Sequence, residues 1–103
     1  MKTEHLLKNK KYDFLKVLAR ELLLYENSEI EEAVIHISKR IKVSEEKIRW
    51  FISFLYRNGL LIKYERGQKY ALTLNGVNFL LDLAESCYFS QNLEGEGYER
   101  GRG

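Results

Sequence analysis

Apolar residues recur at helical spacing in two stretches of the first forty or so positions. The first stretch runs from Lys10 to Tyr25 and predicts a helix with an apolar face of Phe14, Leu15, Leu18, Leu22 and Tyr25. The second begins at Ser28, which stands three residues before Glu31, the spacing of a capping box. This stretch predicts a helix that buries Ile30, Val34, Ile37 and Ile41.

A third helical pattern follows a short connection near Lys42 and Val43. Ser44 is the expected N-cap of this helix, and Gly59 is its expected stop. Helix pairs of this kind commonly place Gly in the connection, where this chain has Lys42, so we expect a slightly longer turn. The inward face holds Ile48, Phe51, Ile52 and Leu55, and the outward residues are Glu46, Lys47, Arg49, Trp50, Ser53, Tyr56 and Arg57.

The segment after Gly59 predicts a β-hairpin. Residues 63–65 enter a tight tip and residues 69–71 leave it. The tip is Arg66, Gly67 and Gln68, where Gly67 supplies the positive φ that a short connection needs. Arg66 is therefore expected to project into solvent.

The last apolar stretch predicts a helix over residues 74–89, capped by Thr73. Its apolar positions cover more than one face, and they are Val77, Leu80, Leu81, Ala84, Cys87 and Tyr88. Because packing on a small core requires one face, we expect this helix to contact a further partner. Residues 90–103 contain four of the seven glycines and few apolar groups, which predicts a flexible tail.

Together these elements predict an α+β fold that is mostly α. We expect one domain over residues 1–89, followed by the tail at 90–103, which suits a length of 103 residues. We find no run of about 18 apolar residues and no export leader, so we expect a cytoplasmic protein. The single cysteine, Cys87, excludes an internal disulfide and agrees with a reducing compartment, although an intermolecular bridge stays open.

Positive charge is concentrated in the middle of the chain. The whole sequence has a net charge of only +2. Between His36 and Tyr70, however, nine Lys and Arg residues accompany three Glu residues, a balance of +6. Because binding to nucleic-acid phosphates requires such a cationic surface, this segment is the candidate binding region.

The sequence contains no group of residues typical of an enzyme or a metal centre. His5 and His36 are far apart, and neither has further ligands at metal-binding spacing. Cys87 has no assignable base, and no glycine-rich loop for phosphate is present. We therefore expect no catalytic residues, no cofactor and no metal.

Two runs carry a resemblance to a known family. They are Val43-Ser44-x3-Ile48-x3-Ile52-x2-Leu55-x3-Gly59-Leu60-Leu61 and Tyr70-x-Leu72-Thr73-x2-Gly76. Over about residues 28–83 the chain resembles winged helix-turn-helix regulators of the MarR and PadR type, and also small winged-helix proteins of archaea and their viruses. The resemblance implies three helices, a hairpin wing and a C-terminal helix. It also implies a nucleoid-associated protein, or a host-cytoplasmic one if the chain is viral.

This family resemblance implies a regulator that binds double-stranded DNA. The second helix of the motif enters the major groove, and the wing contacts the adjacent backbone or minor groove. We expect Arg49 to pair with guanine and Ser44 and Lys47 to hold phosphate. The full predicted set is Ser44, Lys47, Arg49, Trp50 and Ser53 in the groove, Lys63, Arg66 and Lys69 on the wing, and Lys39, Arg40 and Lys42 on the flanking backbone.

We also expect a homodimer, because terminal helices form the two-fold interface in related proteins. The predicted contacts are on the last helix, with the N-terminal helix as a second candidate, and they are Leu80, Leu81, Ala84, Cys87 and Tyr88. Two alternatives stay open at this point. One is an architectural DNA binder with little sequence preference, and the other is a protein-contact module in which Trp50, Phe54 and Tyr56 form an apolar patch.

Overall fold

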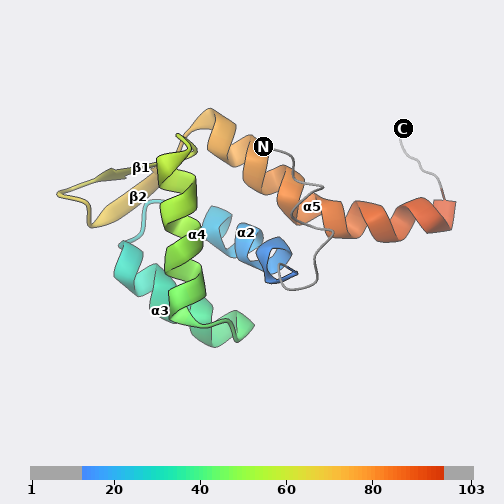
Figure 1. Ribbon diagram of the computed structural model, residues 1–103, viewed down its shortest axis with the longest axis horizontal. Coiled ribbons are helices and arrows are strands. Elements are labelled where there is room, and N and C mark those ends of the chain that lie inside the picture. The colour runs from blue at the N-terminus through green and yellow to red at the C-terminus, as the bar shows by residue number, and fades with distance from the viewer. Residues whose placement is uncertain (1–12, 97–103) are drawn as a thin grey trace.

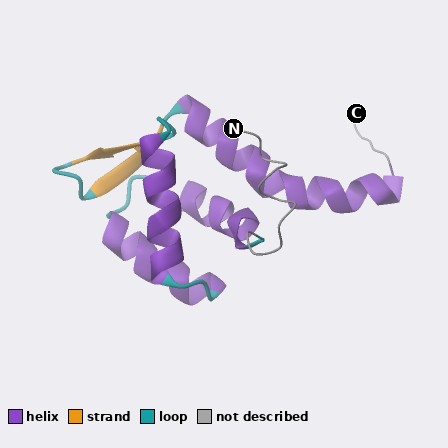
Figure 2. Ribbon diagram, viewed as in Figure 1, coloured by secondary structure: helices purple, strands orange, loops and turns teal. Residues whose placement is uncertain are grey.

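The computed structural model describes the backbone of residues 13–96 and the side chains of residues 13–85. Within this range lie four helices and one antiparallel hairpin (Figures 1 and 2), which confirms the predicted α+β, mostly helical composition. The elements in chain order are α2 (Phe14–Leu24), α3 (Ile30–Ile41), α4 (Glu45–Arg57), β1 (Leu61–Tyr64), β2 (Lys69–Leu72) and α5 (Leu74–Glu96). No helix in this range is long and apolar enough to cross a bilayer.

The core forms where α2 packs against α3 and α5. Leu15, Leu18 and Leu22 of α2 are fully buried, as their helical spacing predicts. The structure also confirms the predicted inward face of α4. Its four residues are buried: Ile48, Phe51, Ile52 and Leu55. Burial of this apolar area is the main favourable term in folding a chain of this size.

Helix α4 begins and ends as its sequence predicts. The side chain of Ser44 accepts a hydrogen bond from the backbone N–H of Lys47 at 3.2 Å, which confirms Ser44 as the N-cap. At the other end Asn58 is the C-cap, and Gly59 follows with a φ of 73°. This left-handed residue lets the chain leave the helix and enter β1.

The connection between α3 and α4 is shorter than expected. It consists of residues 42–44, and Lys42 itself adopts the left-handed conformation, with φ 59° and ψ 43°. The predicted longer turn is therefore wrong, because Lys42 takes the conformation that Gly commonly provides. Ser38 stabilises the turn: its hydroxyl donates to the carbonyl of Val43 at 2.7 Å, and its own carbonyl accepts from the N–H of Lys42.

Helix α3 does not begin with the predicted capping box. Its N-cap is Glu29, which makes no side-chain capping bond, and Ser28 lies outside the helix. The backbone there pairs with the hairpin instead: Tyr70 N–H donates to the carbonyl of Ser28, and Ile30 N–H donates to the carbonyl of Gln68. Tertiary pairing with β2 thus takes the place of local capping.

The hairpin is attached to α2 through Tyr70, which is fully buried. Its hydroxyl donates to the carbonyl of Leu22 at 2.5 Å. Leu22 lies in the last turn of α2, where helix carbonyls lack intrahelical partners, so this bond satisfies a buried acceptor. A second link runs from the backbone N–H of Leu72 to a carboxylate oxygen of Glu26, at 2.9 Å.

Helix α5 begins at a tight crossing with the segment that joins α4 to β1. The hydroxyl of Thr73 accepts from Gly76 N–H and donates to the carbonyl of Gly59, both at 3.0 Å, which confirms Thr73 as the cap. A Cβ on Gly76 would lie 1.7 Å from the carbonyl oxygen of Leu60. The Leu-Thr-x-x-Gly spacing therefore reflects a hydroxyl cap followed by a residue that must have no side chain.

Both ends of the described chain differ from the predicted boundaries. Helix α2 begins at Phe14, and residues 10–12, which the sequence assigned to the same helix, lie outside the described residues. Helix α5 continues to Glu96, past the predicted end at Phe89, and its distal part extends beyond α2 (Figure 1). The predicted flexible tail is therefore wrong for residues 90–96, which are helical, and it stays a prediction for residues 97–103, which lie outside the described residues.

Replacement of Gly76 tests the tight crossing. We expect Gly76→Ala to lower the free energy of unfolding by about 3 kcal/mol or more, because the new methyl group meets backbone that cannot rotate away. Urea denaturation measures this change. Gly67→Ala is the control: it has open space and a φ of 81°, so it should cost only about 1 kcal/mol. A Gly76→Ala protein as stable as wild type would contradict the close approach.

Tyr70 should make stability sensitive to high pH. Burial is the main cause that raises the pKa of its phenol above the ordinary value of 10, and Glu26 adds a smaller electrostatic effect. Since the folded protein keeps the proton while the unfolded chain loses it, this contribution is intact below pH 10 and falls as pH rises further. We expect up to about 1.4 kcal/mol of stability to be lost per pH unit above 10.

The comparison with Tyr70→Phe isolates this effect from other groups that titrate in the same range. The variant has no phenol to ionise, so its unfolding free energy should fall less steeply above pH 10 than that of the wild type. Chemical denaturation at pH 8, 10, 11 and 12 measures the two slopes. Identical slopes would mean that Tyr70 is not held neutral by the fold.

Candidate nucleic-acid interface

Helix α4 presents an exposed ridge opposite its buried face. The ridge is defined by Glu46, Trp50, Ser53 and Arg57, whose spacing of four, three and four residues places them in one line along the helix. Trp50 is 42% exposed, a large fraction for an indole. In Figure 1 α4 lies at the front of the molecule, with α2 and α3 behind it. This ridge is open to an external partner, and Lys47 and Tyr56 beside it are exposed as well.

One flank of α4 faces α3 and the hairpin. Arg49 lies on this flank and forms ion pairs with Glu31 at the start of α3 and with Glu45 one turn earlier on α4. Further along the same flank, the ammonium of Lys63 lies 4.6 Å from the ring centre of Tyr56. Both cations are therefore already engaged by groups of the protein itself.

The opposite flank of α4 faces α2 and α5, and it is aromatic. Lys47 lies there, with its ammonium 5.3 Å from the ring centre of Phe14. Phe54 stacks on Trp50 with ring centroids 6.2 Å apart, and it also contacts Phe79 of α5 at 6.2 Å. Lys47 and Arg49 thus point to opposite sides of the helix, so the predicted groove-reading set is divided between two flanks and the ridge.

Near the turn between α3 and α4, Arg40 forms an ion pair, whereas the neighbouring lysines do not. Its guanidinium pairs with the buried carboxylate of Glu21, with Nε 3.0 Å from Oε1 and Nη2 3.5 Å from Oε2. The hydrogen bond to Glu21, followed by the charge of Glu21, raises the pKa of Arg40. Arg40 therefore links α3 to α2. The sequence pattern predicted only a contact with the flanking DNA backbone for this residue. Lys39 and Lys42 are exposed and make no ion pair with any residue in 13–85.

The hairpin tip holds three consecutive left-handed residues. The φ angles are 50° for Glu65, 60° for Arg66 and 81° for Gly67. The value for Gly67 confirms the prediction, whereas the other two are costly for residues with a Cβ, at about 1–2 kcal/mol each. Lys69 pairs with Glu65 at 3.5 Å, while Arg66 is exposed and has no ion pair in the described part of the chain.

Between His36 and Tyr70, the cations that are not engaged in ion pairs fall into two groups, one near each end of α4. The turn with Lys39 and Lys42 lies at one end, and the hairpin with Arg66 projects from the other (Figure 1). Thirteen residues of α-helix separate the two ends, which is a length of about 20 Å. Arg57 belongs to the second group. It was an outward residue in the sequence pattern but was not included in the predicted site.

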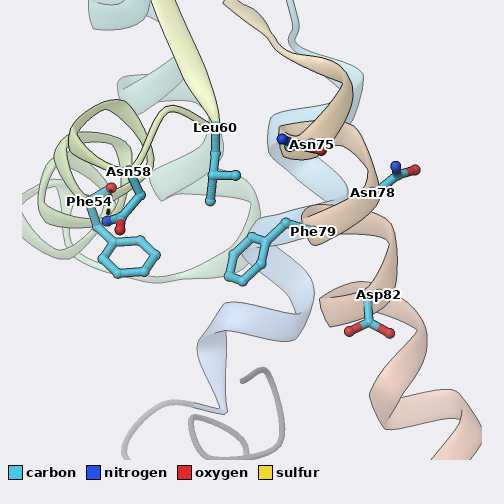
Figure 3. A pocket seen from close by; sticks show the side chains of 7 residues that line it. All are labelled: Phe54, Asn58, Leu60, Asn75, Asn78, Phe79 and Asp82. Carbon is cyan, nitrogen blue, oxygen red and sulfur yellow. Dashed lines mark hydrogen bonds between the residues drawn. The ribbon is translucent and has the colours of Figure 1, made fainter. Parts of the chain in front are cut away.

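A cavity of about 480 Å³ opens between the end of α4 and the start of α5 (Figure 3). Its aromatic walls come from Phe54 and Phe79, and the amides of asparagines lie at its rim. The complete lining is Phe54, Asn58, Leu60, Asn75, Asn78, Phe79 and Asp82. The cavity continues the aromatic flank of α4 rather than the exposed ridge.

No cluster of three or more His, Cys, Asp and Glu side chains suited to a metal ion occurs among residues 13–85, whose side chains the structure describes. A scan against protein-family models and searches of curated proteins and solved structures find no match for this chain. The geometry of the described residues therefore carries the functional argument by itself.

Proposed function

We propose that this chain is a winged helix-turn-helix protein that binds double-stranded DNA and regulates transcription by occupying an operator. The order of elements supports the proposal: α3, a three-residue turn, α4, and then directly a hairpin. In winged-helix proteins the second helix of this order enters the major groove, and the hairpin contacts the neighbouring backbone or minor groove.

The observation that carries the proposal is the exposed ridge of α4, with unpaired cations near both of its ends. A major groove about 12 Å wide admits one helix, and phosphates line both of its edges. Cations near the two ends of α4 suit contacts with those edges, while the middle of the ridge faces the bases. Trp50 and Ser53 occupy that middle part.

Each group has a role in this proposal. Lys39, Lys42 and Lys47 hold phosphates at the start of α4, and Arg57 holds a phosphate at its end. Ser53 and Arg49 hydrogen-bond to base edges, and the indole of Trp50 contacts apolar base edges such as the thymine methyl group. Arg66, presented at the strained hairpin tip, enters the minor groove or clamps the adjacent backbone, with Lys63 and Lys69 beside it.

A homodimer is part of the proposal. Leu80 and Ala84 of α5 are buried in the core, so these two predicted interface residues are not open to a second copy, whereas Leu81 is 42% exposed on another face. The distal part of α5 extends beyond the other described elements in Figure 1. A second copy packed there would allow two α4 helices to read half-sites about 34 Å apart. The side chains of Cys87 and Tyr88, also predicted at this interface, lie outside the described set.

The aromatic flank of α4 favours one alternative, a module that binds another protein. Phe54, which stacks on Trp50, lines the cavity in Figure 3. Aromatic surfaces of this kind are typical of protein interfaces. Tyr56 does not join this patch, because it lies on the opposite flank beside Lys63. The patch named from the sequence is therefore reduced to two residues.

Removal of two cations tests the DNA-binding proposal. We expect the double variant R49A/R66A to bind its preferred duplex about a hundredfold more weakly, because one base contact and one wing contact are lost. The slope of log affinity against log salt should fall by about one. Fluorescence anisotropy at several salt concentrations measures both quantities, on a duplex selected from a random pool at about 0.15 M salt.

The control for loss of charge is Arg20→Ala, which removes an exposed cation from α2, and it should weaken binding by less than about threefold. If R49A/R66A behaves like Arg20→Ala, the proposed binding surface is wrong and the protein-contact module gains support. An architectural binder would lose affinity in the double variant, yet it would prefer the selected duplex to random DNA by far less than about a thousandfold.

The dimer is tested by molar mass in solution. We expect light scattering at tens of micromolar to give twice the chain mass of 12.2 kDa. Leu81→Glu should yield monomers because it places a charge in the proposed interface. Ile62→Glu alters an exposed isoleucine on β1, away from the terminal helices, and should leave the mass unchanged. A wild-type protein at monomer mass would contradict the proposed assembly.

A further inference from the structure

Two carboxylates from different helices hold Arg49. Its Nη2 contacts Oε1 of Glu31, which lies in the first turn of α3, and lies 3.5 Å from Oε1 of Glu45 on α4. The carboxylate side chains remain open to solvent, with exposed fractions of 70% for Glu31 and 49% for Glu45. Arg49 itself is 41% exposed. All three charges therefore lie at the surface beside the ridge of α4.

An approaching nucleic acid must compete with these two carboxylates for Arg49. A phosphate offers the guanidinium another anion, but it brings negative charge close to Glu31 and Glu45, which repel it. Guanine offers two neutral acceptors, O6 and N7, that match the guanidinium fork without such repulsion. The arrangement therefore lowers affinity for bare backbone more than affinity for a correctly placed guanine.

We propose that Glu31 is a specificity-determining residue of the DNA site, which keeps Arg49 from pairing with phosphate so that binding there selects guanine. This inference rests on the proposed function. Of the two carboxylates, Glu31 is the better candidate for this role. It comes from a separate helix and makes the closer contact, whereas Glu45 lies four residues before Arg49 and also follows the N-cap of α4.

Glu32 provides a matched control. It lies next to Glu31 in the first turn of α3, is exposed, and makes no ion pair with a described residue. Glu31→Gln and Glu32→Gln change the net charge equally and remove the same favourable interaction with the helix dipole. A difference between them in DNA binding therefore reports the contact with Arg49, and thermal unfolding of both variants checks that each is folded.

The experiment measures the affinity of full-length variants for two duplexes, a random-sequence pool and the sequence selected from it by the wild type. We expect Glu31→Gln to tighten binding to the random pool by about tenfold and to the selected duplex by less than about threefold. The ratio of the two affinities should thus fall. Glu32→Gln should change both affinities equally. In an Arg49→Ala background, Glu31→Gln should have the same effect as Glu32→Gln.

Two results would overturn the inference in distinguishable ways. If wild type binds the selected duplex but Glu31→Gln leaves the affinity ratio unchanged, Glu31 does not set specificity and the proposed function survives. The same conclusion follows if the ratio falls equally in the Arg49→Ala background, since the effect would not act through Arg49. If wild type binds neither duplex at about 0.1 M salt, the proposed function and this inference both fail.

Discussion

The hydrogen bond from the buried hydroxyl of Tyr70 to the carbonyl of Leu22 determines how the hairpin sits on the helices. Tyr70 is the largest fully buried side chain among the described residues, so its polar tip requires a partner inside the protein. The end of α2 provides that partner. With β2 held in this position, its backbone pairs with residues 28–30, and this pairing sets where α3 begins. The same strand leads directly into Thr73, so the direction of α5 also follows from it.

The cations of the central segment have two different kinds of environment. Arg40 compensates Glu21, a carboxylate that is almost completely buried and would be costly to leave unpaired. Its contact is therefore structural. Lys39, Lys42, Arg57 and Arg66 have no ion pairs within the described chain, and they are the cations most available to phosphates. A count of charges along the sequence cannot separate these two kinds, because the difference depends on which acids the fold brings near.

Three of the four faces of α4 explain why one helix supports two functional interpretations. The buried face anchors the helix, and the ridge of Glu46, Trp50, Ser53 and Arg57 is open to a groove. The aromatic flank, with Phe54 against Phe79, continues into the cavity beside α5. Because Trp50 belongs to the ridge and also stacks on Phe54, a partner on either surface would meet the same indole. The proposed DNA contact is favoured since the unpaired cations lie near the ends of the ridge.

Local patterns in the sequence were sufficient to predict most helix faces, the cap at Ser44 and the left-handed Gly67. These features depend on residues only a few positions apart. The start of α3 and the partners of Arg40 and Arg49 were decided by tertiary structure. Each of these depends on segments distant in sequence: β2 against Ser28, Glu21 against Arg40, and Glu31 against Arg49. Hydrophobic periodicity reports which side of a helix is buried, but it carries no information about which charged group from another element faces the exposed side. For this reason the sequence alone could identify α4 as the candidate binding helix, whereas the fold determined which of its charges are available to a partner.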